Sequence, residues 1–276
     1  MSNSLPVVLT VAGSDSGGGA GVQTDLRTFN TFNVYGCSAV TAVTAQNPNE
    51  VRRVDIMPLE SVKMQLASVL ELFPVRFAKT GMLANKEIVE CVAEFAGKYN
   101  LKLIVDPVMI STSGACLLEK AAISVMQEKL FPLAEWITPN IPEAEFLCNR
   151  QLTTMEDLAG AARQLFNKYK CNCLLKGGHA AAAYQASDIV CYQGRVFTVS
   201  SPAVQLPRNT AHGTGCTLSA AITAILAKGG DWQQALTDAK AFVYGSLTEN
   251  RNLSDTLTQM FPPVKNYSDQ IYWKEL

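Results

Sequence analysis

Two glycine-rich segments have the composition of loops that hold a negatively charged group. The first, Gly13-Ser-Asp-Ser-Gly-Gly-Gly-Ala-Gly21, lies between an apolar run and an amphipathic segment. Its glycines let backbone N–H groups approach a ligand, and the N-terminus of a following helix favours negative charge. It is not a Walker loop, because no Lys-Ser or Lys-Thr pair follows the glycines. A tight turn between strand and helix needs fewer glycines, so we expect this loop to contact a ligand.

The second segment is His212-Gly-Thr-Gly-Cys216, which precedes an apolar stretch of helical length. Its two glycines leave the backbone N–H groups of Thr214 to Cys216 exposed at a helix start, a nest for an anion such as a transferring phosphoryl group. The helix dipole lowers the pKa of a thiol at this position, so we expect Cys216 to be a thiolate near neutral pH. Such a thiolate accepts the proton of an attacking hydroxyl group. The alternative is a buried cysteine in a glycine-rich cap.

Two further segments carry groups that suit metal and phosphate chemistry. Asn140 and Glu143 stand three residues apart at a predicted helix start, where an amide and a carboxylate can share a hydrated Mg²⁺. The alternative is a proline-started helix with an acidic first turn. Lys176 ends a predicted strand and is followed by two glycines, which suits a loop that faces phosphates. Asp106 stands at another strand tip, where it either orients Mg²⁺ or simply ends the strand.

These residues must be positioned by the elements around them, and apolar runs alternate with amphipathic segments along the whole chain. The expected strands are Val7–Ala12, Ser38–Ala45, Val75–Lys79, Lys102–Val105, Trp136–Thr138 and Cys173–Lys176, with a hairpin formed by Asp188–Tyr192 and Arg195–Val199. The expected helices are Ala20–Phe32, Leu59–Phe73, Lys86–Tyr99, Glu119–Leu130, Thr154–Tyr169, Thr214–Lys228 and Trp232–Asn250. Thr153 with Glu156 predicts a capping box at the start of the fifth helix.

Strands that alternate with helices of this length predict β-α-β crossovers. We therefore expect one α/β domain, residues 1–276, with a mostly parallel sheet covered by helices on both faces. Ligands of such sheets bind beyond the carboxyl ends of the strands. The four segments described above all follow predicted strands or precede helices, so we expect them to meet there.

Composition excludes several classes of protein. Of the 276 residues 48% are hydrophobic and 17% charged, so a large core is available and disorder is not expected. The formal net charge of −1 lacks the basic excess of a nucleic-acid or membrane surface. The N-terminus has no signal-peptide features, and no apolar stretch reaches the length of a membrane span. Eight cysteines without a CxxC pair, and only two histidines, argue against zinc and predict reduced thiols in a cytoplasmic protein.

In their order and spacing, the segments resemble the ribokinase-like superfamily, specifically the hydroxymethylpyrimidine/phosphomethylpyrimidine kinases of thiamine synthesis. The matching stretches are Val11-Ala-Gly-Ser-Asp-Ser-Gly-Gly-Gly-Ala-Gly-Val-Gln-Thr-Asp25, Thr41-Ala-Val-Thr-Ala-Gln46, Lys79-Thr-Gly-Met-Leu83, Asp106-Pro-Val-Met109 with Ser113-Gly114, Thr138-Pro-Asn-Ile-Pro-Glu-Ala144, Lys176-Gly-Gly-His179 and Asn209-Thr-Ala-His-Gly-Thr-Gly-Cys-Thr217. The resemblance implies a three-layer α/β/α fold, a homodimer, and the use of ATP with Mg²⁺. It also implies phosphorylation of a pyrimidine hydroxymethyl group and then of the phosphomethyl product.

By position, the resemblance implies roles for individual residues. The implied pyrimidine pocket is formed by Gly13, Asp25, Gln46, Met82 and Val108. The implied anion hole is formed by Gly213, Thr214 and Gly215, with Cys216 in place of the aspartate base of sugar kinases. The implied magnesium-side residues are Asn140 and Glu143, to which we add Asp106, and the nucleotide-side residues are Lys176, Gly177, Gly178, His179 and Thr210. The amide of Gln46 suits its role, because it can pair with an aminopyrimidine donor and a ring-nitrogen acceptor.

The chain departs from the family pattern at two places and leaves two other functions open. Ala211 separates Asn209-Thr210 from the histidine of the second glycine segment, and the C-terminal stretch Asn252–Leu276 lacks the family's glycine- and histidine-bearing segment. One alternative function is a pyridoxal or pyridoxine kinase, because relatives with the same His-Gly-Thr-Gly-Cys segment act on pyridoxal-type rings. The other is a catalytically silent protein of the same fold that binds a ring.

Overall fold

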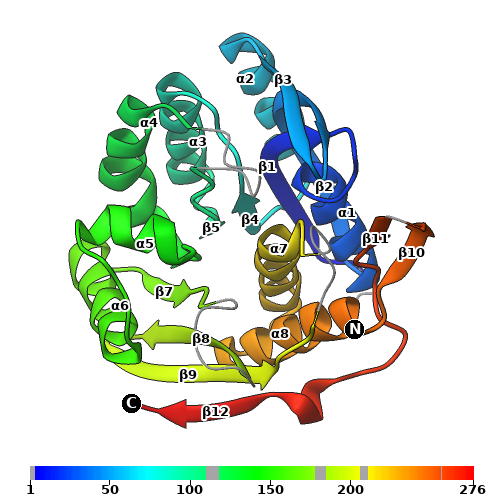
Figure 1. Ribbon diagram of the computed structural model, residues 1–276. Coiled ribbons are helices and arrows are strands. Elements are labelled where there is room, and N and C mark those ends of the chain that lie inside the picture. The colour runs from blue at the N-terminus through cyan, green and yellow to red at the C-terminus, as the bar shows by residue number, and fades with distance from the viewer. Residues whose placement is uncertain (1–3, 110–117, 178–184, 206–210, 256) are drawn as a thin grey trace.

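A ten-stranded sheet forms the centre of the protein in the computed structural model, which describes residues 4–109, 118–177, 185–205, 211–255 and 257–276 (Figure 1). The strands follow one another across the sheet in the order β12-β9-β8-β7-β6-β5-β4-β1-β2-β3. Their bounds are β1 Val7–Asp15, β2 Tyr35–Asn47, β3 Glu50–Ile56, β4 Phe77–Thr80, β5 Lys102–Val105, β6 Ala134–Ile137, β7 Asn172–Leu175, β8 Gln185–Tyr192, β9 Arg195–Pro202 and β12 Tyr272–Glu275.

The middle of the sheet is parallel and its two edges are antiparallel. Strands β2, β1, β4, β5, β6 and β7 pair in parallel, whereas β3 on one side and β8, β9 and β12 on the other run antiparallel to their neighbours. Parallel neighbours require crossovers, and helices supply them here. The predicted mostly parallel sheet is confirmed.

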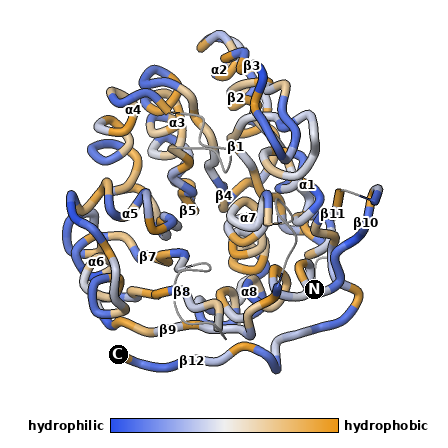
Figure 2. The backbone as a smooth tube through the Cα atoms, in the orientation of Figure 1, coloured by the Kyte–Doolittle hydropathy of each residue, from blue (hydrophilic) through white to orange (hydrophobic). Residues whose placement is uncertain are grey.

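Helices cover both faces of the sheet. Residues alternate along β1, so that Val8 packs with α1 and α7 on one face and Leu9 joins the larger core on the other. Figure 2 shows α7 as hydrophobic over most of its length, in agreement with its burial against β4, β1 and α8. None of the described helices combines the length and hydrophobicity needed to cross a membrane. The helix bounds are α1 Gly21–Thr31, α2 Leu59–Leu70, α3 Lys86–Lys98, α4 Lys120–Val125, α5 Ile141–Cys148, α6 Met155–Tyr169, α7 Thr214–Ala227 and α8 Trp232–Thr248.

Two details of the helices differ from the sequence-based expectations. The helix expected over Glu119–Leu130 changes after Val125 into a π-helical turn, Met126–Leu130, and then a 3-10 turn. The capping box of α6 is formed by Thr154 and Asp157, so the pair Thr153 and Glu156 was wrong by one residue. The sequence gives two adjacent threonines and two adjacent acids, and their backbone conformation decides which pair caps the helix.

Several short or polar elements were not expected. Strand β3 carries alternating charged residues and is mostly exposed, so it has no apolar run to reveal it. A separate two-stranded sheet, β10 Arg251–Ser254 and β11 Leu257–Gln259, follows α8 and lies beside α1 (Figure 1). Strand β12 then pairs with β9, so the divergent C-terminal stretch is ordered by the main sheet.

Candidate active site

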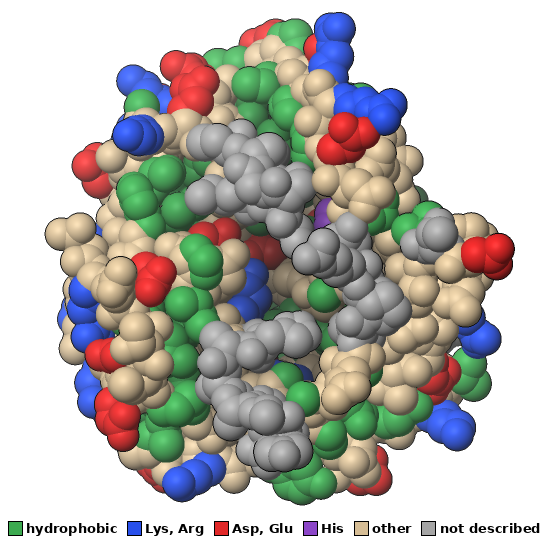
Figure 3. Space-filling model, viewed as in Figure 1, with side chains coloured by type: hydrophobic (Ala, Val, Ile, Leu, Met, Phe, Trp, Pro, Cys, Tyr) green, Lys and Arg blue, Asp and Glu red, His purple; other side chains and the backbone are tan. Residues whose placement is uncertain are grey.

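A cavity of about 340 Å³ opens at the carboxyl ends of the parallel strands. Its wall is formed by the glycine-rich loop after β1, the end of β2, the start of α7, and residues just beyond β4, β5, β6 and β7. Figure 3 shows a hollow on this face in which acidic and basic side chains are visible. The expectation that the four segments meet beyond the strand ends is confirmed. The predicted site residues that line the cavity are Gly13, Gln46, Met82, Val108, Asp106, Asn140, Glu143, Lys176, Gly213, Thr214, Gly215 and Cys216.

The start of α7 lies tightly against the glycine-rich loop. Gly213 has φ of 85° at the N-cap, a left-handed conformation that favours glycine. A Cβ at Gly213 would overlap the carbonyl oxygen of Gly19, so glycine is also needed for this close approach. Among the described residues, the backbone N–H groups of Gly215 and Cys216 have no hydrogen-bond partner, as expected for the first turn of a helix. The cavity wall therefore contains free donors for an anion.

The thiol of Cys216 lies at this helix start, but it is not set to be a thiolate. Burial raises its pKa above the ordinary value, and the nearby charge of Lys79 only partly opposes that effect. The carboxylates of Asp25 and Asp106 raise the pKa further. The expectation of a thiolate near neutral pH is therefore wrong for this structure, because desolvation outweighs the helix dipole.

Charged side chains face one another across the cavity floor. The ammonium group of Lys176 lies 2.7 Å from a carboxylate oxygen of Asp106. Burial raises the pKa of Glu143 to about 7, with the Asp106 charge adding to the rise and Lys176 opposing it. Burial alone would lower the pKa of Lys176, but Asp106 and Glu143 hold it above its ordinary value. Lys176 therefore stays a cation, placed where a phosphate would be stabilised.

Asn140 and Glu143 form the start of α5, and their role toward Mg²⁺ stays a prediction. The amide oxygen of Asn140 accepts from the backbone N–H of Glu143 at 2.9 Å, and the Glu143 carboxylate accepts from the backbone N–H of Asn140 at 2.8 Å. This is a capping box for α5, and both residues also line the cavity. Among the described residues no cluster of three or more metal-ligating side chains occurs. The two carboxylates of Asp106 and Glu143 suit Mg²⁺, which keeps most of its waters and needs few protein ligands.

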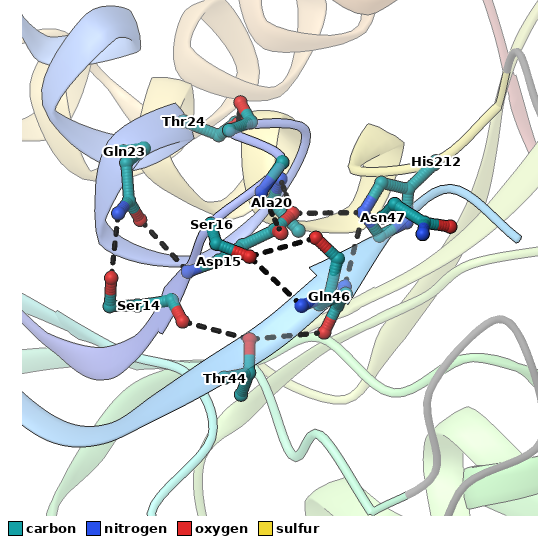
Figure 4. A network of polar contacts seen from close by, with 12 residues as sticks. Ser14, Asp15, Ser16, Ala20, Gln23, Thr24, Thr44, Gln46, Asn47 and His212 are labelled. Carbon is teal, nitrogen blue, oxygen red and sulfur yellow. Dashed lines mark hydrogen bonds and ion pairs between the residues drawn. The ribbon is translucent and has the colours of Figure 1, made fainter. Parts of the chain in front are cut away.

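A polar network ties the glycine-rich loop to α7 and to Gln46 (Figure 4). The carboxylate of Asp15 accepts backbone N–H groups of Gly17 and Ala20, and lies 3.0 Å from Nε2 of His212. Burial would raise the pKa of Asp15, but these hydrogen bonds hold it below the ordinary value, so the group is a carboxylate. His212 must then donate from Nε2, because a carboxylate only accepts.

The Gln46 amide lies between two groups whose protons are already used. The amide lies 3.2 Å from Nε2 of His212 at one end and 3.5 Å from the hydroxyl of Thr44 at the other. The Thr44 hydroxyl already donates to the backbone oxygen of Ser14 at 2.9 Å. The one Nε2 proton of His212 is directed at Asp15 and the one hydroxyl proton of Thr44 at Ser14, so the hydrogen-bonding groups of the Gln46 amide are available to a ligand. Sequence reasoning missed Asp15 and His212, although both stand inside motifs that it quoted.

An apolar wall lies beside Gln46. Met82 and Val108 pack with Ala42 and Ala84 in a small cluster at the cavity. A Cβ at Gly13 would lie 3.2 Å from the sulfur of Met82, so the glycine leaves room along this wall. An amide beside a flat apolar surface is suited to a polar aromatic ring.

Asp25 lies behind this cavity and does not line it. Its side chain is 0% exposed, and so is that of Lys79, whose ammonium group lies 2.7 Å from it. The hydroxyl of Thr10 donates to the same carboxylate at 2.6 Å. The structure thus gives Asp25 an ion-pair role and separates it from the residues predicted with it for the ring pocket. Lys79, which was not predicted, reaches the cavity wall.

The family of the chain follows from its sequence relatives. The model of the phosphomethylpyrimidine kinase family matches residues 15–260. The chain belongs to the phosphomethylpyrimidine kinase family. The kinase is 45% identical over 257 residues to hydroxymethylpyrimidine/phosphomethylpyrimidine kinase of Haemophilus influenzae, covering 92% of this chain and 94% of the relative. It is 43% identical over 242 residues to a bifunctional thiamine biosynthesis protein of Geobacter sulfurreducens, covering 87% of this chain but 49% of that longer protein.

Solved structures give the same fold. The kinase matches pyridoxal kinase of Staphylococcus aureus in complex with pyridoxal, with a TM-score of 0.89 at 30% identity. The match covers 99% of this chain and 100% of the other. That protein was also solved with ADP, and with AMP-PCP and pyridoxal together. The ribokinase-like α/β fold is therefore shown, and the ordered C-terminal stretch of the kinase has a counterpart in that structure.

Some predicted residues of the nucleotide side are not placed by the structure. Gly178, His179 and Thr210 lie outside the described residues. Gly177 is described, and its backbone N–H donates to Asp188 at 2.9 Å, but it does not line the cavity. The nucleotide role of this loop remains a prediction.

Proposed function

We propose that the kinase transfers a phosphoryl group from ATP to the hydroxymethyl group of hydroxymethylpyrimidine, and then to its monophosphate, in thiamine biosynthesis. The observation that carries the proposal is the cavity itself. It places an amide and an apolar wall for the ring opposite free helix N–H groups and a thiol. Membership of the phosphomethylpyrimidine kinase family supports the choice of ring.

In the proposed reaction, the hydroxymethyl oxygen of the ring forms a new bond to the γ-phosphorus while the bond from that phosphorus to ADP breaks. Cys216 accepts the hydroxyl proton, so its thiol must first lose its own proton. The N–H groups of Gly215 and Cys216, with Lys176, stabilise negative charge on the transferring group. Mg²⁺ would be held at the Asp106 and Glu143 side, where it would neutralise phosphate charge.

Gln46→Leu is expected to weaken pyrimidine binding at least about tenfold, with a smaller effect on turnover at saturation. Leucine has a similar side-chain volume but neither the donor nor the acceptor of the amide. Polar groups of the bound ring would then lack partners, which lowers the binding free energy by roughly 1–3 kcal/mol. Steady-state kinetics with varied hydroxymethylpyrimidine would measure KM and kcat separately. An unchanged KM would place the ring elsewhere in the cavity.

Glu143→Gln is expected to raise the Mg²⁺ concentration needed for half-maximal activity by about tenfold. Glutamine can still accept from the backbone N–H of Asn140, so the capping box and the fold should persist. Titrating activity with Mg²⁺ at fixed ATP would measure the shift, and thermal unfolding would serve as the control. If the Mg²⁺ requirement does not change while activity falls, Glu143 acts through Lys176 or Asp106 rather than on the metal.

The second candidate function is pyridoxal kinase, and the full-length structural match to the Staphylococcus aureus enzyme favours it. Coupled ATP turnover with hydroxymethylpyrimidine and with pyridoxal, at matched concentrations, separates the two. Mass analysis of the pyrimidine product, showing one or two added phosphoryl groups, tests both proposed steps. Ring binding without phosphorylation of either compound would instead identify a catalytically silent protein.

The proposal also covers the setting of the reaction. We infer a single domain, because one ten-stranded sheet runs from β3 to β12. We infer a homodimer and a cytoplasmic location; all cysteines in the described part of the chain are free thiols, which agrees with a reducing compartment. Light scattering of the purified protein would measure its oligomeric state.

A further inference from the structure

A second cavity, of about 180 Å³, lies on the other side of the glycine-rich loop from the active-site cavity. The loop residues Gly17 to Gly19 line this second cavity, whereas Gly13, Asp15 and Gly21 line the first. His212 is in the wall of both. The two cavities are therefore separated by one loop and one imidazole ring.

The C-terminal hairpin provides one wall of the second cavity. Arg251 of β10 pairs directly with Gln259 of β11, so their side chains leave the same face of the hairpin. Leu253 of β10 and Phe261, which follows β11, also line the cavity. One face of the hairpin thus closes a cavity over the glycine-rich loop, within the stretch where the sequence departs from the family pattern.

Hydrogen-bonding groups of this cavity are unused. The side-chain nitrogen of Gln259 is buried and has no partner in the described structure. The residues Thr217 and Ser246 also line the cavity, and their hydroxyl groups form no hydrogen bond with another described residue. Buried polar atoms are nearly always satisfied by protein, water or ligand. The one buried atom without a partner, the Gln259 nitrogen, points to a polar group bound in this cavity, and the two hydroxyl groups add further donors.

The charge of the cavity shows which sign that group carries. Arg27 and Arg251 line it, and neither forms an ion pair with another described residue. Among the described residues, the guanidinium group of Arg27 donates only to the backbone oxygen of Gly18, at 3.1 Å. The wall, as far as the structure describes it, contains no aspartate or glutamate. Two uncompensated guanidinium groups with amide and hydroxyl donors favour an anion, most of all a phosphate.

The rest of the wall is apolar. Phe242 and Phe261, with Leu253 and Pro262, line the cavity beside the polar groups. A free inorganic anion would leave this surface without a partner, whereas an ester with a compact apolar or aromatic group would cover it.

We propose that this cavity is a second binding site, for a small phosphate monoester with a compact apolar or aromatic body. The phosphate is held by Arg251 and Arg27, and the body lies against Phe242 and Phe261. Because His212 is in both walls and contacts Gln46, occupancy of the second site changes the KM for the ring substrate more than kcat.

Calorimetry with phenyl phosphate tests the proposal, with Mg²⁺ and saturating AMP-PCP present to fill the phosphoryl site of the active cavity. The wild-type protein is expected to bind one equivalent. Arg251→Gln is expected to weaken binding at least about tenfold, because it removes a charged donor. Arg52→Gln is the matched control, since Arg52 is an exposed arginine on β3 that lines neither cavity. Its affinity should equal that of the wild type.

The same experiment can overturn the proposal. Equal affinity of the wild type and of Arg251→Gln for phenyl phosphate would exclude the second cavity as its binding site. Loss of phenyl phosphate binding on addition of AMP-PCP would assign the ligand to the active cavity instead. Gln259→Leu, on the strand opposite Arg251, is an independent check and should also weaken the binding of phenyl phosphate. Inorganic phosphate and neutral benzyl alcohol should each bind more weakly than phenyl phosphate, and equal binding of benzyl alcohol would exclude an anion site.

Discussion

Replacing Cys216 by alanine is expected to lower kcat by about a hundredfold or more, the usual contribution of a general base, while the affinities for ATP and for the ring change little. The side chain lies at the cavity wall beside the free N–H groups of α7, so we expect it to contact the reacting hydroxyl group rather than the body of the ring. Steady-state kinetics would measure both quantities. Turnover within a few-fold of the wild type would mean that the anion hole acts without a thiolate base.

The pH dependence of turnover gives a sharper form of this prediction. Burial raises the pKa of the Cys216 thiol, so the thiolate fraction, and with it kcat, should rise with pH through the neutral range and beyond pH 8 or so. Cys216→Asp should move this rise to lower pH, because in the same surroundings a carboxyl group ionises at lower pH than a thiol. Profiles of kcat for the two proteins would show the difference. A flat wild-type profile would mean either that MgATP lowers the pKa of the thiol or that another group accepts the proton.

Lys79→Met is expected to destabilise the kinase by roughly 3–5 kcal/mol, because it leaves the carboxylate of Asp25 buried without its cation. Both side chains are 0% exposed and their charged atoms lie 2.7 Å apart. Lys79 also lowers the pKa of Cys216, so this variant should lose turnover at neutral pH as well. Urea unfolding would measure the change in the free energy of unfolding. Lys102→Met, which removes a half-exposed partner of Glu135, is the control and should change stability by less than about 1 kcal/mol.

A combined variant separates the ion-pair role of Asp25 from a ring-binding role. Thr10→Val, Asp25→Leu and Lys79→Met together remove the whole buried polar group, and most of the lost stability should return. If Asp25 instead contacts the ring, as sequence reasoning suggested, Asp25→Asn would raise KM for the ring with little loss of stability. Urea unfolding measures the ion-pair role and steady-state kinetics measures the ring-binding role, so the two outcomes are distinct.

The sequence was sufficient for the architecture because the signals of a parallel α/β sheet are local. Continuous apolar runs such as Leu103 to Val105 indicate strands buried on both faces, and glycine-rich loops after strands indicate the ligand end of the sheet. Strand β3 and the hairpin β10–β11 were missed because short, polar strands have no periodic apolar signal. Their pairing partners, rather than their own residues, hold them in place.

The site was predictable in its members but not in their chemical states. Motif spacing brought Gln46, Lys176 and Cys216 to one cavity, as the structure shows. Asp25 pairs with Lys79, a side chain more than fifty residues away, and this partner decides that its carboxylate does not line the cavity. The pKa of Cys216 likewise depends on side chains that are distant in the sequence. Burial depends on the whole fold, so the spacing of residues in a motif does not predict the ionisation state of its side chains.

The contact between Gly213 and Gly19 joins positions from opposite ends of the chain. Strand β1 precedes the other strands of the sheet in the chain, yet it lies inside the sheet between β4 and β2. Its loop must meet a helix that is made nearly two hundred residues later. The phosphoryl-binding corner therefore exists only once the chain from β1 to α7 has come together. Recovery of enzymatic turnover after dilution from denaturant should for this reason report completion of long-range assembly, and should lag behind the recovery of helical signal.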